Sequence, residues 1–189
     1  MTQERTLRDW YEELRRTQLD AGIIESINLR LADEANPDTR RSLQFILVEE
    51  CKRQERFQEA EAVLRKLSEE PSTEEYPLVS LAEQKLSYEE QPEQAMEIID
   101  RAIVFARISG NFRRLALGVK ARVAIKLERW NAIPDILQEI MSLPPRKKTD
   151  ADISTERDFF DRLPAGAINE ALAKEYEDFC ESRGCFRKP

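Results

Sequence analysis

Side chains that carry most enzyme chemistry are scarce in this 189-residue chain. It has no histidine, which excludes a Ser-His-Asp triad, a Cys-His pair and a histidine-bound zinc. Its cysteines are Cys51, Cys180 and Cys185, too few for the four nitrogen or sulfur ligands that a structural zinc usually has. The five glycines are scattered and form neither of the common glycine-rich phosphate loops. We therefore predict no metal site, no phosphate-binding loop and no cofactor.

Adjacent glutamates such as Glu49-Glu50, Glu69-Glu70 and Glu89-Glu90 are the remaining candidates for acid–base chemistry. Catalytic carboxylates need burial or an unlike neighbour to separate their pKa values. These pairs stand at the expected ends of helices in polar sequence, so we expect them to be solvated. The chain is accordingly predicted to have no catalytic residues and not to be an enzyme.

Charge is abundant and unevenly distributed along the chain. There are 30 basic and 37 acidic residues, for a formal net charge of −7. Residues 1–109 hold 15 basic and 24 acidic side chains, residues 110–149 hold 9 and 3, and residues 150–189 hold 6 and 10. A general nucleic-acid binder needs a dominant basic face, so no nucleic-acid partner is expected. One basic block in an acidic chain suits an acidic peptide, or contacts between the chain's own segments.

Apolar runs long enough for a membrane are missing from the sequence. None approaches the roughly 20 residues that a membrane-spanning helix needs. The first ten residues show neither an apolar stretch nor a signal-peptide cleavage pattern. The sequence therefore predicts a cytoplasmic protein without a membrane partner.

Helical periodicity runs through almost the whole chain. Glycine is rare, and apolar residues recur three and four positions apart, as in the stripe Leu7, Trp10, Tyr11 and Leu14. We predict an all-α protein of helical hairpins at about residues 5–35, 41–70, 76–108 and 111–143. Because Pro144-Pro145 cannot continue a helix, a linker is expected at 144–153. A helical extension at 154–185 follows, with an apolar stripe from Ile168 to Phe179.

Three of the expected second helices begin alike. They start with Arg56-Phe57-Gln-Glu-Ala60, Gln91-Pro92-Glu-Gln-Ala95 and Arg129-Trp130-Asn-Ala-Ile133, at spacings of 35 and 38 residues. A period in the thirties with two helices in each unit is typical of a helical solenoid, in which each hairpin buries the apolar face of its neighbour. The alternative is an ordinary helical bundle.

These segments resemble the tetratricopeptide repeat family over about residues 40–143. In the segment from Arg56 to Leu67 an aromatic residue, a small alanine and a bulky residue follow in the family's order, and Pro71 closes the unit. Leu117-Gly118 is similar to the family's pair in the first helix, and Trp130 with Leu137 to its second-helix pattern. The resemblance implies a right-handed α-α superhelix, a solenoid of helical hairpins. The C-terminal helical extension at 154–185 follows it and is not covered by the resemblance.

The resemblance also implies a concave groove lined by the first helix of each hairpin, which holds a peptide or a partner protein. The residues expected to bind the partner are Tyr11, Arg15, Lys52, Arg53, Tyr88, Arg122 and Lys126, with Gln84, Ser87 and Arg129 on the same faces. Most of these are basic, and arginine and lysine form charge-assisted hydrogen bonds with carboxylates. We therefore expect a non-catalytic adaptor or scaffold for a protein or peptide partner, with an acidic one favoured. Reversing Lys52 and Arg53 to glutamate is expected to remove binding without lowering the melting temperature.

Three placements are open for the extension at 154–185. It can cap the end of the array, fill the groove as an autoinhibitory helix, or join two copies into a homodimer. The last placement is the basis of an alternative function, a structural or regulatory subunit that self-associates through residues 150–189.

Overall fold

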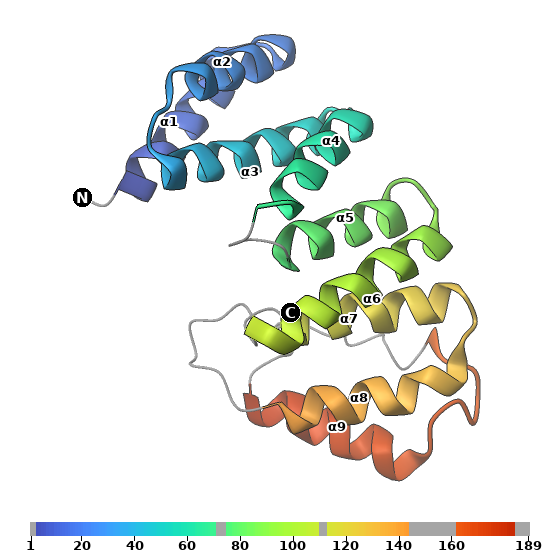
Figure 1. The fold of residues 1–189 in the computed structure, drawn as a ribbon. Helices are drawn as coiled ribbons and strands as arrows, with labels where there is room; N and C mark the ends of the chain where they lie inside the picture. Colours follow the sequence, from blue (N-terminus) through green and yellow to red (C-terminus); the bar gives the residue numbers. More distant parts are fainter. Residues whose placement is uncertain (1–2, 71–74, 110–112, 144–161, 184–189) are drawn as a thin grey trace. The chain divides into compact units, whose positions relative to one another are not determined.

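Residues 3–70, 75–109, 113–143 and 162–183 are described by the computed structural model of the chain, and every regular element within these ranges is helical (Figure 1). The prediction of an all-α protein is confirmed. None of these helices combines the length and apolar character needed to cross a bilayer. The helices are α1 (Gln3–Thr17), α2 (Asp20–Asp33), α3 (Pro37–Arg53), α4 (Phe57–Ser68), α5 (Glu75–Ser87), α6 (Pro92–Ser109), α7 (Arg113–Lys126), α8 (Ile133–Ser142) and α9 (Glu170–Arg183), with a 3-10 turn at Trp130–Ala132.

The chain forms two compact units, Met1–Thr73 with α1 to α4 and Glu74–Pro189 with α5 to α9. We call them the N-terminal unit and the C-terminal unit. Each has its own buried apolar core. The division falls between the second and third of the predicted hairpins.

In the N-terminal unit, α3 is the central helix. It packs against α1, α2 and α4, and its buried side chains form the core of the unit together with buried residues such as Ile27 of α2 and Leu64 of α4. Its start is set by Asn36, whose side-chain oxygen accepts hydrogen bonds from the backbone N–H groups of Asp38 and Thr39, each at 3.0 Å. Pro37 occupies the first turn, where its missing N–H costs nothing. The Asn36-Pro37 pair therefore both ends one hairpin and begins the next.

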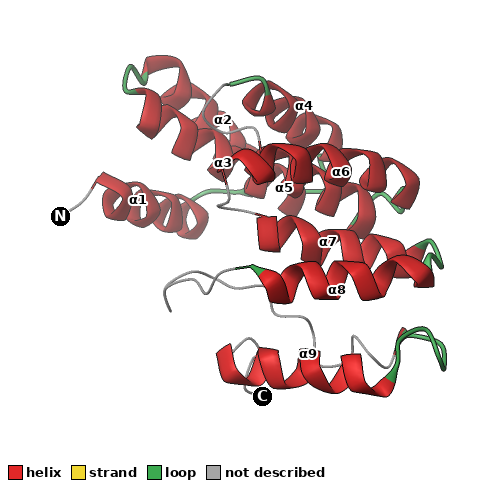
Figure 2. Ribbon diagram, turned by 60° about the horizontal axis from the view of Figure 1, so that its bottom comes forward, coloured by secondary structure: helices red, strands yellow, loops and turns green. Residues whose placement is uncertain are grey.

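In the C-terminal unit, α6 packs against α5 and α7, α7 also contacts α5, and α8 packs against α7 (Figures 1 and 2). The fully buried side chains Leu81, Ile99, Leu117 and Leu137 come from these four helices, one from each. The contact between α5 and α7 places the first helices of two consecutive hairpins side by side. That is the neighbour-on-neighbour packing that a stacked pair of hairpins requires.

Helix α9 packs against α8, as Figures 1 and 2 show. Its buried side chains, Leu172, Tyr176 and Cys180, are spaced by four residues and share one face. This is the contact that a cap on the fourth hairpin would make, and a dimer formed through the same face would have to compete with it. The predicted linker at 144–153 and the start of the predicted extension lie outside the described residues.

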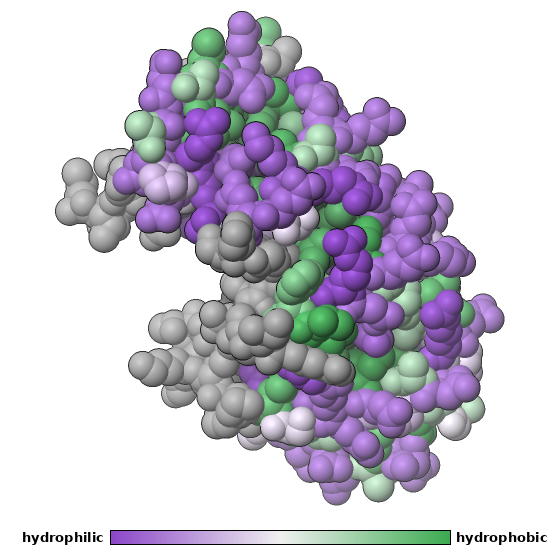
Figure 3. All heavy atoms as spheres, in the orientation of Figure 1, coloured by the Kyte–Doolittle hydropathy of each residue, from purple (hydrophilic) through white to green (hydrophobic). Residues whose placement is uncertain are grey.

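Polar residues cover most of the described surface on the face shown in Figure 3. The large apolar side chains that are most exposed are scattered, and they include Leu19, Leu29, Tyr88 and Val104. Single exposed apolar residues of this kind are normal for a globular surface and mark no site by themselves.

Three glutamates repeat at the turn between paired helices. Glu55, Glu90 and Glu128 have φ values of 58°, 51° and 55°, in the left-handed region that L-residues other than glycine seldom adopt. Each directly precedes one of the three repeated segments, so the turn recurs at the same 35- and 38-residue spacings. The repeat in the sequence is therefore a repeat of backbone conformation.

The turns after α3 and α7 also have matching backbone hydrogen bonds. The N–H of Arg56 donates to the carbonyl of Cys51 at 2.8 Å, and the N–H of Arg129 donates to the carbonyl of Ala124 at 2.9 Å. Such a bond across six residues, with a left-handed residue inside it, is the usual way to close the carboxyl end of a helix. Glycine is the residue that normally occupies the left-handed position.

Replacing Glu128 with glycine is expected to stabilise the protein by about 0.5 to 1 kcal/mol, because relief of the left-handed strain exceeds glycine's extra entropy in the unfolded chain. The matched control is Glu97→Gly, an exposed glutamate within α6, which should instead destabilise by about 1 kcal/mol. Urea unfolding of both variants measures the difference. Shifts of the same sign in the two variants would contradict the assignment of strain to Glu128.

Candidate functional site

The seven residues predicted to bind a partner fall in both units. Four lie in the N-terminal unit, at Tyr11, Arg15, Lys52 and Arg53, and three in the C-terminal unit, at Tyr88, Arg122 and Lys126. In the N-terminal unit some of them surround a buried carboxylate, and in the C-terminal unit some of them line a pocket. The sequence revealed neither of these features.

The N-terminal unit contains a buried carboxylate. Glu50 is fully buried, and its carboxylate accepts hydrogen bonds from the Tyr11 hydroxyl at 2.7 Å, from Arg53 Nε at 3.1 and 3.2 Å, and from Gln54 Nε2 at 2.6 Å. Arg53 also pairs with Asp20, and Gln54 donates to the Asp20 carbonyl at 2.7 Å. These five residues, the Glu50 cluster, tie α1 and the start of α2 to α3.

The expectation that Glu50 is solvated is wrong. Its burial depends on Tyr11, which is 39 residues away in the sequence and belongs to another helix. Arg53 and Gln54 stand three and four positions after Glu50, so their contacts follow from helix geometry. The tyrosine contact, by contrast, is made only by tertiary packing.

Electrostatics keep Glu50, Tyr11 and Arg53 each in one protonation state near neutral pH. Burial alone would raise the pKa of Glu50, but the hydrogen bonds from Arg53, Gln54 and Tyr11 outweigh it and lower the pKa to about 2. Burial and the bond to Glu50 raise the pKa of Tyr11, and the bonds to Glu50 and Asp20 raise that of Arg53. These three side chains, held in fixed charge states, position helices and do not exchange protons near neutral pH.

The neighbouring thiol of Cys51 is also held in its neutral form. Burial, followed by the charge of Glu59, raises the pKa of Cys51 to about 11. A reactive cysteine needs a lowered pKa and some exposure, whereas Cys51 is buried. Cys51 is therefore a packing residue of α3.

Acid should destabilise the N-terminal unit through Glu50. Because the pKa of Glu50 is lower in the folded state than its ordinary value of 4.5, the stabilisation is fully present above pH 4.5 and is lost as the pH falls towards 2. Urea unfolding between pH 5 and 2.5 measures this, with Glu50→Gln as the comparison. The variant should be less stable at pH 5 and should lose less on acidification. Parallel pH profiles for the two proteins would contradict the assignment.

The structure shows what surrounds the four predicted binding residues of the N-terminal unit. Tyr11 and Arg53 make the bonds described above, and the Arg15 guanidinium stands 5.8 Å from the centre of the Tyr11 ring. Lys52 is half-buried.

Arg53→Glu would place a second carboxylate beside the buried Glu50. We therefore expect the double reversal of Lys52 and Arg53 to lower the melting temperature, unlike the expectation from the sequence. A role of these four residues in binding stays a prediction.

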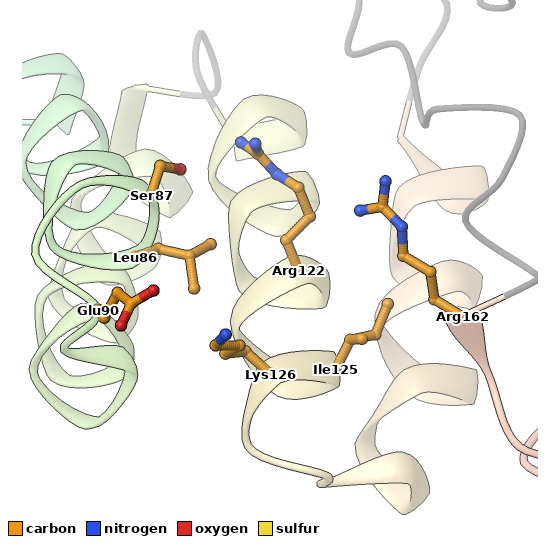
Figure 4. A pocket seen from close by; sticks show the side chains of 7 residues that line it. All are labelled: Leu86, Ser87, Glu90, Arg122, Ile125, Lys126 and Arg162. Atoms are coloured by element: carbon orange, nitrogen blue, oxygen red, sulfur yellow. The ribbon is translucent and has the colours of Figure 1, made fainter.

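A pocket of about 440 Å³ opens on the C-terminal unit, shown in close-up in Figure 4. Arg122, Ile125 and Lys126 stand at one face of α7, because residues three and four apart on a helix are neighbours. The remaining lining comes from the end of α5, the turn after it and the segment before α9, at Leu86, Ser87, Glu90 and Arg162. We call these seven residues the basic pocket.

The basic pocket brings together part of the predicted set. Arg122 and Lys126 line it, as does Ser87, which the sequence places on the same predicted face. Tyr88 follows Ser87 and is 53% exposed, but it does not line the pocket. Arg162 was missed, because no pattern in the sequence indicates that the segment before α9 returns to α7.

The charged side chains of the pocket differ in how they are paired. Arg122 donates to Glu83 of α5 at 2.6 Å, an ion pair that orients its guanidinium and joins α5 to α7. Lys126 and Glu90 make no ion pair within the described part of the chain. Beside the pocket the buried Lys85 binds Glu89 at 2.7 Å and so anchors the turn that carries Glu90. The pocket therefore offers fixed positive charge, a hydroxyl and the apolar side chains of Leu86 and Ile125.

Such a site can hold an anionic group. In the described ranges no three cysteine, aspartate or glutamate side chains lie close enough to bind a metal ion. Comparison with models of protein families, with curated proteins and with solved structures finds no match to this chain. The resemblance to tetratricopeptide repeats is thus a prediction from the residues quoted above.

Proposed function

We propose that the chain is a non-catalytic protein-binding module, an adaptor whose stacked helical hairpins form a solenoid similar to tetratricopeptide repeats. It holds a peptide segment of a partner protein against the first helices of its hairpins. The observation that carries the proposal is the basic pocket, where α5 and α7 contribute Ser87, Arg122 and Lys126 to one opening. These two helices are the first helices of consecutive hairpins, the elements expected to line a groove.

The packing of the C-terminal unit supports this proposal in two ways. The contact between α5 and α7 stacks one hairpin on the next, and the recurring left-handed glutamate marks equivalent turns in consecutive hairpins. Stacked hairpins present their first helices as a continuous surface. Side chains on that surface can then contact an extended peptide at successive positions.

The test is selection of random 12-residue peptides, displayed on phage, against the full-length protein. Enriched peptides should bind the Lys126→Glu variant at least tenfold more weakly, because the reversal replaces an attraction with a repulsion. Lys126 is exposed and makes no ion pair in the described chain, so its replacement should leave the melting temperature unchanged.

The matched control is Lys174→Glu, the same change at an exposed lysine of α9 that does not line the pocket. It should bind the selected peptides like the unaltered protein. Equal binding by Lys126→Glu and Lys174→Glu would remove the pocket from the proposal. Failure to enrich any peptide would count against peptide binding itself.

A further inference from the structure

The basic pocket contains one carboxylate, that of Glu90, and its surroundings bear on which peptides the pocket accepts, in an inference that rests on the proposed function. We infer that Glu90 is a specificity-determining residue, which binds the side chain of a lysine or arginine in the bound peptide. The aliphatic stem of that side chain lies on Leu86, and its charged end meets the Glu90 carboxylate.

Glu90 differs from the neighbouring glutamates in how it is paired. Glu83 pairs with Arg122, and Glu89 pairs with Lys85. Glu90 is exposed and lines the pocket, and its carboxylate takes part in no ion pair or hydrogen bond with the residues that the structure describes. Of these three carboxylates, that of Glu90 is therefore the one open to a ligand.

The turn after α5 fixes the backbone that carries Glu90. On one side, the carboxylate of Glu89 accepts hydrogen bonds from Lys85 Nζ at 2.7 Å and from Gln84 Nε2 at 2.8 Å. On the other side, the N–H of Gln91 donates to the carbonyl of Lys85 at 2.8 Å. Glu90 lies between these two anchored residues, with a φ of 51°. Because its backbone is already held in place, little ordering of the turn is needed when a ligand binds.

Leu86 supplies an apolar surface on the same side of the pocket. In Figure 4, Leu86 and Glu90 stand on the side away from Arg162. The side chain of Leu86 is partly exposed, and lysine and arginine bury their aliphatic stems on such a surface while the charged end stays in water. A basic side chain can thus cover Leu86 and form a charge-assisted hydrogen bond with Glu90, which a short or neutral side chain cannot do.

Lys126 sets the charge next to this contact. It lines the pocket and makes no ion pair with a described residue. A uniformly basic segment would be repelled by Lys126, and a uniformly acidic one would be repelled by Glu90. The pocket therefore selects segments that carry both signs of charge, with the basic residue at Glu90.

The experiment is a double-mutant cycle on the full-length protein with the phage-selected peptides. Each lysine or arginine of a peptide is replaced in turn by norleucine, which keeps an aliphatic stem without the charge, and binding is measured by fluorescence anisotropy. At one position the replacement should weaken binding to the unaltered protein about fivefold. The same replacement should have no effect on binding to Glu90→Gln, because the partner of the lost charge is already missing.

The matched control is Glu128→Gln, at the equivalent turn after α7. Glu128 is exposed and has the same left-handed conformation, with a φ of 55°, but it does not line the pocket. This variant should show the full fivefold effect of the norleucine replacement. Neither glutamate makes an ion pair with a described residue, so both variants should keep the melting temperature of the unaltered protein.

Three results would overturn the role of Glu90 and leave the module a peptide binder. The first is a set of enriched peptides without lysine or arginine. The second is a norleucine replacement that weakens binding to the unaltered protein and to Glu90→Gln equally. The third is tighter binding of the parent peptides by Glu90→Gln, which would show that Glu90 only competes with the peptide for Lys126. If no peptide is enriched, the proposed function has failed, and the role of Glu90 fails with it.

Discussion

Arg53→Met is expected to lower the free energy of unfolding of the N-terminal unit by about 3 kcal/mol. The substitution keeps much of the side chain's apolar length but removes the guanidinium that bonds both carboxylate oxygens of Glu50. Glu50 is fully buried and cannot turn to water, so its charge loses its cationic partner inside the protein. Tyr11 and Gln54 still donate to it, and they limit the loss without replacing the missing charge. Urea unfolding monitored by circular dichroism measures the change.

Arg65→Met is the matched control for this prediction. Arg65 pairs with Glu61 on the surface of α4 at 2.7 Å, and 52% of its side chain is exposed. Surface pairs of this kind contribute about 0.3 to 0.5 kcal/mol. Adding Glu50→Gln to Arg53→Met should recover part of the loss, because it removes the charge left without a cation. Equal effects of Arg53→Met and Arg65→Met would show that the Glu50 cluster does not stabilise the unit.

Leu64→Ala is expected to destabilise the N-terminal unit by about 2 to 5 kcal/mol. Leu64 of α4 has no exposed surface, and its removal loses the transfer free energy of three carbons and leaves a cavity against α3. Hydrogen exchange measured by mass spectrometry should show faster exchange in α3 and α4. The helices of the C-terminal unit should exchange at unchanged rates, because the two units have separate cores.

Leu29→Ala provides the same substitution on the same unit at an exposed site. Leu29 of α2 is 64% exposed, so its truncation should change the free energy of unfolding by no more than about 0.5 kcal/mol. Faster exchange throughout both units in Leu64→Ala would contradict the division of the core. A small effect of Leu64→Ala, similar to that of Leu29→Ala, would contradict the burial of α4.

The helices could be predicted because the information for each lies in a short stretch of sequence. Apolar residues three and four apart imply a buried stripe, and Asn36-Pro37 combines a cap with a residue suited to the first turn. The equivalence of the turns was also visible, as the repeated segments at Arg56, Gln91 and Arg129. Their left-handed glutamates were not visible, because glutamate gives no signal for that conformation where glycine would.

Some residues of the basic pocket could likewise be predicted from the sequence, and one could not. Arg122 and Lys126 stand four residues apart on one helix, so their common face follows from helix geometry alone. Ser87 could be assigned to the same predicted face because the sequence repeat aligns α5 with α7. Arg162 could not be placed, since it belongs to the extension predicted at 154–185, whose position relative to α7 depends on how whole helices pack.

Local sequence alone determined that this protein is helical, that its segments repeat, and that Arg122 and Lys126 share one face of α7. These properties depend on neighbours within about four positions along the chain, where helix geometry leaves little freedom. Tertiary structure alone decided that Glu50 is buried beneath Tyr11, and that Arg162 meets Arg122 and Lys126 at one pocket. Such contacts join residues tens of positions apart, and the packing of whole helices, rather than any local pattern, brings them together.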